Sequence, residues 1–189
     1  MIIVSQNLTN FDFPLPEDSI FRINLAWVNS IEQLKNLLQK HLEYKIFLDL
    51  PIGRTKPPDN KYSFEDMIPV IRDFKNIKYF AISNVNSKMD LEPYKKSIPE
   101  HVTLVPKIES PTGVKNIEEI VNYLGNEKMV MLDHDDLFSN TIKQNESPLE
   151  FKEYFSNLVN FCTSHNVQLL RTIGVVFSEQ EKRITEYMQ

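Results

Sequence analysis

The residues best suited to chemistry are a lysine and two carboxylates in the second half of the chain, Lys107, Glu109 and Asp136. The two acids follow neighbouring predicted strands, and their hard oxygen atoms suit Mg²⁺ or Mn²⁺, which keep positions open for water and substrate. Lys107 stands two residues before Glu109, so on a strand both side chains point to one face. A lysine beside a divalent ion stabilises a developing enolate, although a surface lysine paired with an acid has the same spacing.

Polar side chains also stand at the ends of the other predicted strands. They are Asn24, Asp49, Ser83, Asn84, Lys107, Glu109, the four residues 133–136, Arg171 and Thr172. Each one taken singly is explained as well by a helix N-cap or a solvated loop residue. Every predicted strand contributes to the set, however, and in a (β/α) barrel the C-terminal ends of all strands meet at one mouth. We therefore expect these side chains to share one pocket.

The acidic run Asp133-His134-Asp135-Asp136 allows other interpretations. It is also typical of a solvated acidic loop. A histidine among carboxylates can bind a transition metal or act as a base, which makes His134 a second candidate in this run. We rank this below the Mg²⁺ site because no second histidine stands at ligand spacing.

Short apolar runs alternate with amphipathic stretches along the chain, which predicts βαβ units and a parallel sheet. The predicted strands cover residues 21–28, 45–50, 79–85, 102–108, 129–132 and part of 167–176. The predicted helices cover residues 30–43, 88–97, 117–124 (closed by Gly125) and 149–165, and two more begin at Ser63 and Ser178. Because the strands are apolar on consecutive residues, we expect both faces of the sheet to be covered.

The composition is that of an ordinary globular chain of 189 residues, 41% hydrophobic and 25% charged, with a net charge of −5. This length predicts one domain, residues 1–189. No basic residues form a stripe, which argues against a nucleic-acid partner. The sequence has neither a signal peptide nor the roughly 18 apolar residues of a membrane span, so we expect a cytoplasmic protein. Cys162 stands among apolar residues and is expected to be buried and inert.

Residues 105–120, V-P-K-I-E-S-P-T-G-V-K-N-I-E-E-I, resemble the pyruvate kinase segment K-I-E-N followed after a short spacer by G-V-x-N-x-x-E-I. Residues 131–137, M-L-D-H-D-D-L, are similar to that family's M-V-A-R-G-D-L. The resemblance implies that Lys107 stabilises the enolate of pyruvate and that Glu109 and Asp136 bind Mg²⁺. The same segments also resemble the aldolases and citrate lyase-type lyases of the phosphoenolpyruvate/pyruvate-binding barrel superfamily, which act on enolates with Mg²⁺.

Weaker similarity extends over most of the chain. R-I-N-L-A-W at 22–27 is similar to the family's R-x-N-x-S-H, F-L-D at 47–49 to L-L-D, I-S-N-V at 82–85 to A-S-F-V, and 167–172 to P-V-I-C-A-T. Arg22 or Arg54 would hold the substrate's carboxylate or phosphate, since a guanidinium fork matches both. The matches imply further site residues, which are Asn24 and Ser83 for substrate, Asp49 for a monovalent cation, and Thr172 as a substrate-contacting catalytic residue.

The sequence departs from the pyruvate kinase pattern at the cation site and beside the metal-binding aspartate. Ala26 replaces the serine and Leu50 replaces the threonine of the K⁺ site, which disfavours bound K⁺. His134 and Asp135 replace the R-G pair before Asp136, which adds a negative charge beside an anionic substrate. The lid domain and the C-terminal domain of the family are both missing.

These observations predict a TIM-barrel-like parallel (β/α) barrel that is incomplete, with about seven strands instead of eight. Either residues 1–5 supply a strand and the barrel stays open, or a second copy of the chain closes it. An open parallel edge is a liability, which makes a homodimer the expected partner arrangement.

The sequence leaves three functions open. The first is a Mg²⁺-dependent enzyme acting on phosphoenolpyruvate, pyruvate or a related 2-oxo acid through an enolate; the missing lid disfavours phosphoryl transfer and leaves C–C cleavage or condensation. The second is a non-catalytic relative that serves as a binding or scaffolding module. The third is a plain open α/β sheet with a chance resemblance. A fold hosts many chemistries and does not decide between them.

Overall fold

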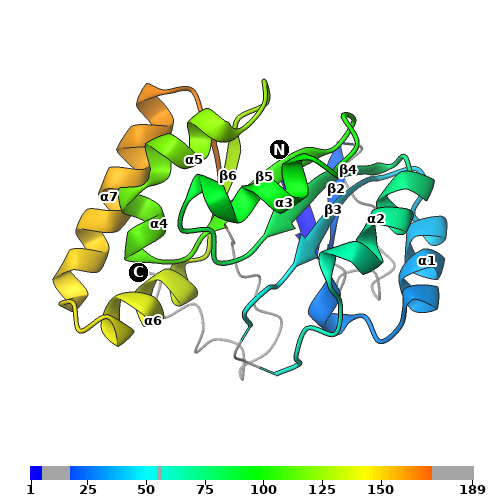
Figure 1. Cartoon of the computed structure of the whole chain (residues 1–189), viewed down its shortest axis with the longest axis horizontal. Helices are drawn as coiled ribbons and strands as arrows, with labels where there is room; N and C mark the ends of the chain where they lie inside the picture. Colours follow the sequence, from blue (N-terminus) through cyan, green and yellow to red (C-terminus); the bar gives the residue numbers. More distant parts are fainter. Residues whose placement is uncertain (6–17, 55–56, 172–189) are drawn as a thin grey trace.

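The computed structural model of the chain describes residues 1–5, 18–54 and 57–171. Within them, seven parallel strands form one sheet whose spatial order is the order of the sequence. The strands are β1 (Ile2–Ser5), β2 (Ser19–Asn24), β3 (Lys45–Leu50), β4 (Ile77–Ile82), β5 (Thr103–Ile108), β6 (Met129–Leu132) and β7 (Gln168–Arg171). Figure 1 shows the sheet curling with helices around it, which confirms an incomplete (β/α) barrel.

Most of the helices that connect these strands begin at a residue whose side chain accepts a hydrogen bond from the first turn. The helices are η2 (Leu25–Trp27), α1 (Ile31–Lys40), α2 (Phe64–Asp73), η3 (Lys88–Leu91), α3 (Glu92–Lys95), α4 (Pro111–Lys115), α5 (Ile117–Tyr123), α6 (His134–Lys143) and α7 (Pro148–Ser164). Ser63 caps α2 in a reciprocal box with Asp66, as the sequence predicts. Asp133 caps α6, so the acidic run is the start of a helix rather than a free loop.

Two apolar layers form because successive residues of each strand face opposite sides of the sheet. One layer lies between the sheet and the helices, and Leu48 and Phe80 belong to it. The other fills the concave inner face and consists of Ile20, Phe47, Tyr79, Ala81, Val105, Met129, Met131 and Leu170. Both layers exclude water, so the sheet is covered on both faces.

By the same alternation, the residues that face inward at the C-terminal ends of the strands are polar. Counting by twos, Phe47 leads to Asp49, Ala81 leads to Ser83, and Val105 leads to Lys107 and then to Glu109. Met131 likewise leads to Asp133. The mouth of the barrel therefore continues the apolar interior as a polar layer.

The two outer strands of the sheet are β1 and β7, and no backbone pairing joins them in the described residues. Met1 Sδ nonetheless lies 3.8 Å from Gln168 Nε2 at the start of β7. The curl of the sheet thus brings its two edges close together at the N-terminal end of the barrel.

Several predicted boundaries differ from the structure for local reasons. The strand predicted at 21–28 ends at Asn24, because the Asn24 side chain accepts from the Ala26 backbone N–H and begins η2. Helices α4 and α6 were not predicted. Helix α5 ends at Tyr123 with Leu124 as its C-cap, so Gly125 does not close it in a left-handed conformation. Residues beyond 171, including the predicted helix from Ser178, lie outside the described part.

Two smaller predictions concern burial and membranes. Cys162 is buried in α7, and burial raises the pKa of its thiol to about 11, which confirms the inert interpretation. No helix within residues 1–5, 18–54 and 57–171 combines the length and the apolar character that a membrane crossing requires.

Candidate active site

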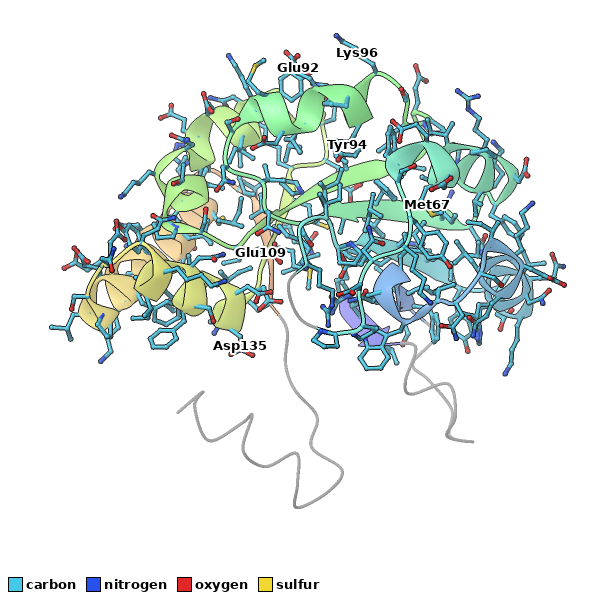
Figure 2. The ribbon with its side chains drawn as sticks, turned by 60° about the horizontal axis from the view of Figure 1, so that its bottom comes forward. Met67, Glu92, Tyr94, Lys96, Glu109 and Asp135 are labelled. Atoms are coloured by element: carbon cyan, nitrogen blue, oxygen red, sulfur yellow. The ribbon has the colours of Figure 1, made fainter. Side chains whose placement is uncertain are left out.

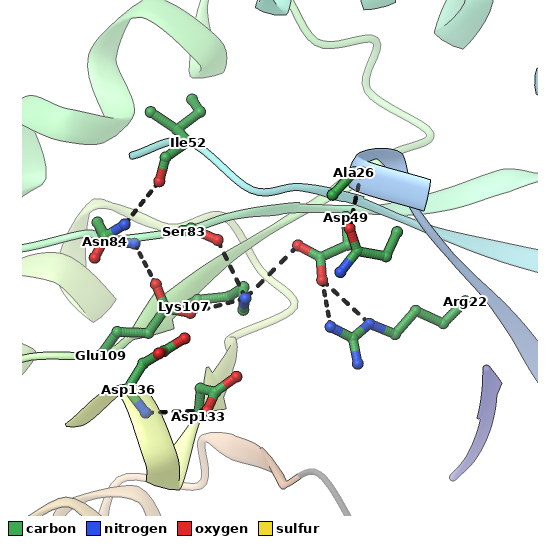
Figure 3. A network of polar contacts seen from close by, with 11 residues as sticks. Arg22, Ala26, Asp49, Ile52, Ser83, Asn84, Lys107, Glu109, Asp133 and Asp136 are labelled. Carbon is green, nitrogen blue, oxygen red and sulfur yellow. Dashed lines mark hydrogen bonds and ion pairs between the residues drawn. The ribbon is translucent and has the colours of Figure 1, made fainter. Parts of the chain in front are cut away.

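A polar pocket with a volume of ≈ 130 Å³ opens at the C-terminal ends of β2 to β6. It is lined by Arg22, Asn24, Pro51, Ile52, Gly53, Arg54, Ser83, Asn84, Lys107, Glu109, Asp133, Asp136, Asn140 and Lys143. Figure 3 shows the polar contacts around Lys107, Glu109 and Asp49 in this pocket. The pocket lies where the fold of a (β/α) barrel places chemistry.

Lys107 lies at the centre of the pocket and is only 4% exposed. Its Nζ lies 2.8 Å from Glu109 Oε1 and 3.8 Å from Asp49 Oδ1, and it donates to Ser83 Oγ at 3.1 Å. Burial alone would lower the pKa of Lys107, but Asp49 and Glu109 reverse this and raise it above the ordinary value. The lysine is therefore a fixed ammonium ion at neutral pH.

Glu109 follows β5 and is held from two sides. One carboxylate oxygen, Oε2, accepts from the Asn84 backbone N–H at 2.6 Å, and its backbone carbonyl accepts from Asn140 Nδ2 at 2.7 Å. Burial raises the pKa of Glu109, and this outweighs the opposing effect of Lys107 and of the Asn84 N–H. A buried carboxylate of this kind is stabilised by a further positive charge, which a bound cation supplies.

Three carboxylates gather beside Lys107. One oxygen from each of Glu109, Asp133 and Asp136 lies within 4.8 Å of the others. Adjacent oxygen ligands of octahedral Mg²⁺ stand about 3 Å apart and opposite ones about 4.2 Å apart, so side-chain rotations that bring these oxygens closer together would place all three on one ion. Asp135 is exposed instead and points outward from α6 (Figure 2). The donor set, oxygen only and partly buried, fits Mg²⁺ or Mn²⁺.

Asp49 is fully buried behind Lys107 and pairs with Arg22. Arg22 Nε donates to Asp49 Oδ2 at 3.1 Å, and Arg22 Nη2 contacts the same oxygen. Burial alone would raise the pKa of Asp49, but Lys107 and Arg22 more than offset this and lower it. Two positive charges of the chain thus stand beside this buried carboxylate.

The structure brings most of the predicted site residues to one place. Those that line the pocket or contact its lining are Arg22, Asn24, Asp49, Arg54, Ser83, Lys107, Glu109 and Asp136. His134 turns away from the carboxylates, because its Nε2 lies 3.2 Å from Arg171 Nη2 and its ring packs on Phe155. Thr172 lies outside the described residues. The catalytic and binding roles of these residues remain predictions.

Asp133, Asn140 and Asn84 were given no catalytic, binding or metal role from the sequence, although Asp133 and Asn84 were expected in the pocket. Asp133 follows from the period-two alternation after Met131, a signal that the sequence does contain. Asn140 lies on α6, which was not predicted. Asn84 contributes its backbone N–H from a left-handed conformation with φ of 57°, which no sequence pattern reveals.

Comparison with known proteins gives structural likeness only. No protein-family model matches the sequence, and no curated protein matches it. The crystal structure of RipC from Yersinia pestis is similar, with a TM-score of 0.60 and 15% identity over 88% of this chain and 75% of that one. The crystal structure of citrate synthase SbnG has a TM-score of 0.58 and 13% identity over 89% and 73%. The chain therefore shares the barrel fold of these two proteins.

Proposed function

We propose that the chain is a Mg²⁺- or Mn²⁺-dependent enzyme that forms or breaks a C–C bond through the enolate of a 2-oxo acid or a related acyl substrate. The observation that carries this proposal is the buried ammonium of Lys107, 2.8 Å from Glu109 in a cluster of three carboxylates. A cation held by the cluster and the ammonium would lie on two sides of one substrate oxygen. That pair of charges is what an enolate requires.

The residues of the chain have distinct roles in this proposal. Glu109, Asp133 and Asp136 would hold the ion, which supplies Lewis acidity toward the substrate carbonyl. Lys107 would redirect one of its three N–H donors from a carboxylate to the substrate oxygen. Ser83 keeps the ammonium in place through the 3.1 Å hydrogen bond. Because burial and the Ser83 hydrogen bond already hold the ammonium in the pocket, only a local change of its hydrogen bonds precedes the reaction.

Two features favour C–C chemistry over phosphoryl transfer to a nucleotide. Only residues 51–63 connect β3 to α2, which leaves no room for a lid domain. One of the two similar structures is named a citrate synthase, an enzyme of the condensing class. The polar, partly buried pocket supports an anionic small-molecule substrate.

The test is calorimetric titration with oxalate, a stable mimic of the pyruvate enolate, with and without Mg²⁺. We expect Mg²⁺-dependent binding to the parent chain. Asp136→Asn should weaken it by more than the roughly 10–100-fold that follows loss of a group supporting a metal ligand. Asp135→Asn, an identical change one residue away on the exposed side, is the matched control and should leave binding unchanged.

Absence of oxalate binding with either Mg²⁺ or Mn²⁺ would refute the proposal. Equal loss in Asp135→Asn and Asp136→Asn would also refute it, because general charge rather than coordination would then explain the effect. Either result would favour the non-catalytic binding module.

A further inference from the structure

The site pocket adjoins a second, larger cavity. The pocket itself holds ≈ 130 Å³, below the roughly 300–1,000 Å³ of sites that enclose a drug-sized ligand. A neighbouring cleft of ≈ 400 Å³ shares Ile52, Gly53 and Arg54 with it. The rest of that cleft is lined by Asp59, Asn60, Tyr62, Ser63, Phe64, Glu65, Pro93 and Tyr94. A substrate larger than a small acid must extend from the pocket into this cleft.

Four basic side chains line the pocket, and two of them are already neutralised. Arg22 pairs with Asp49, and Lys107 lies in ion pairs with Glu109 and Asp49. Within the described residues, neither Arg54 nor Lys143 has a carboxylate partner. Among the described residues that line the pocket, these two cations remain to bind an anionic group of the substrate.

Arg54 is the better placed of the two. It lies on the boundary between pocket and cleft, where Nε donates to the Pro58 carbonyl at 2.9 Å and Nη2 to the Pro57 carbonyl at 3.2 Å. These bonds fix the plane of the guanidinium, and no hydrogen bond to another described residue engages Nη1. A fixed guanidinium loses little freedom on binding a carboxylate. Lys143 is exposed at the end of α6 and has no such support.

The other walls of the cleft place an anion at the Arg54 end. The rings of Phe64 and Tyr94 meet edge to face with centroids 4.6 Å apart, which forms an apolar wall. Asp59 and Glu65 add negative charge to the cleft and disfavour an anion beside their carboxylates. The box between Ser63 and Asp66 already engages two backbone N–H groups at the start of α2, those of these two residues. Arg54 is therefore the anchor for the second anionic group.

We propose that the substrate is a dicarboxylic acid made of two carbon skeletons, one of which forms the enolate. This proposal rests on the function proposed above and specifies its substrate class. The enolate-forming half binds at the carboxylate cluster beside Lys107. The other half lies at the mouth of the cleft, with its carboxylate on Arg54. Two adjoining cavities match a reaction that joins or separates two carbon skeletons, since each half of the substrate then has its own binding cavity.

The experiment compares pairs of 2-oxo acids of four, five and six carbons by calorimetry in the presence of Mg²⁺. Each pair has one dicarboxylic acid and the monocarboxylic acid of equal chain length, for example 2-oxoglutarate and 2-oxopentanoate. We expect at least one pair to show a preference for the diacid on the order of tenfold or more, the value of a charged hydrogen bond. Arg54→Met should abolish that preference, and Arg54→Lys should restore only part of it.

Two controls separate this inference from the proposed function. A urea midpoint of unfolding for Arg54→Met equal to that of the parent shows that this variant is folded, and oxalate binding to the parent chain tests the proposed function separately. Lys143→Met should keep the diacid preference. If oxalate binds but no pair shows a preference that depends on Arg54, the inference is wrong and the proposed function stands. If oxalate does not bind to the parent chain, both fail together.

Discussion

At the scale of single residues, Asn84 orients Glu109 through its own backbone conformation. Its φ of 57° is left-handed, a region that asparagine tolerates better than most residues. In this conformation its N–H points at Glu109 Oε2, 2.6 Å away, while its side chain donates to the Ile52 carbonyl at 2.7 Å. Asn84 thus links the loop after β3 to a residue of the carboxylate cluster.

We expect Asn84→Ala to weaken Mn²⁺ binding by about tenfold, in the range seen when a group supporting a metal ligand is lost. Alanine pays roughly 1–2 kcal/mol in the left-handed region and should shift the N–H away from Glu109. Glycine adopts this region freely, so Asn84→Gly should stay near the parent affinity. The measurement is Mn²⁺ titration followed by electron paramagnetic resonance. Equal losses in both variants would show that the side chain, not the backbone, does the positioning.

At the scale of elements, the position of Glu109 depends on how closely α4 approaches the loop after β4. Helix α4 begins two residues after Glu109, and Ser110 caps it by accepting from the Gly113 N–H at 3.0 Å. A Cβ on Gly113 would lie 2.6 Å from the Val85 carbonyl oxygen, which is backbone and cannot move aside easily. The glycine is there for close approach rather than for an unusual φ.

Gly113→Ala should therefore destabilise the fold by about 1–3 kcal/mol, the usual cost of overpacking. Alanine has a better helix propensity than glycine by about 1 kcal/mol. The variant is therefore destabilised only if the steric clash with Val85 costs more than this gain. The measurement is the urea midpoint of unfolding. Gly125→Ala is the control, since nothing lies within 4 Å of a Cβ there and its midpoint should not fall. A midpoint for Gly113→Ala at or above the parent value would contradict the packing argument.

At the scale of the whole molecule, the barrel is open between β1 and β7. Both edge strands carry backbone groups that no other described strand pairs. The homodimer expected from the sequence stays a prediction. The sheet curls far enough to bring Met1 and Gln168 together, so a second copy of the chain is one of two ways to cover the open edges. The open side leaves the mouth and its carboxylate cluster unaffected, since β2 to β6 supply those residues.

Global stability should fall on acidification, partly through buried histidines. Burial and then Lys40 lower the pKa of His41, whose Nε2 has no hydrogen-bond partner in the structure. As the pH falls, His41 in the unfolded chain, with a pKa of about 6.5, binds a proton before His41 in the folded chain does. Stability is full above that pH and is lost as the pH falls through the folded value.

His41→Gln should accordingly flatten the dependence of the unfolding free energy on pH between about pH 7.5 and 5.5, above the range where carboxylates ordinarily titrate. Urea denaturation at several pH values measures this slope. The exposed residue His165 provides the matched control, His165→Gln. A slope in His41→Gln equal to that of the parent would show that His41 does not contribute.

The sequence by itself determined the strands, most of the helices and the face on which the site residues lie. These follow from local geometry, because the period of two along β5 puts Lys107 and Glu109 on one side whatever the rest of the chain does. The same rule places Asp49 and Ser83 at strand ends. The incomplete parallel barrel also follows, since alternating strands and helices admit few other arrangements.

Only the tertiary structure decided which charges meet. Arg22 pairs with Asp49 because the register of β2 against β3 sets Asn24 opposite Asp49, and that register depends on contacts between distant segments. Asp133 is the N-cap residue of α6 and His134 is its first residue, so the two side chains point in different directions. Asp133 joins the carboxylate cluster, and His134 turns toward Arg171. Pairing depends on the curvature of the whole sheet, and no local pattern in the sequence records it.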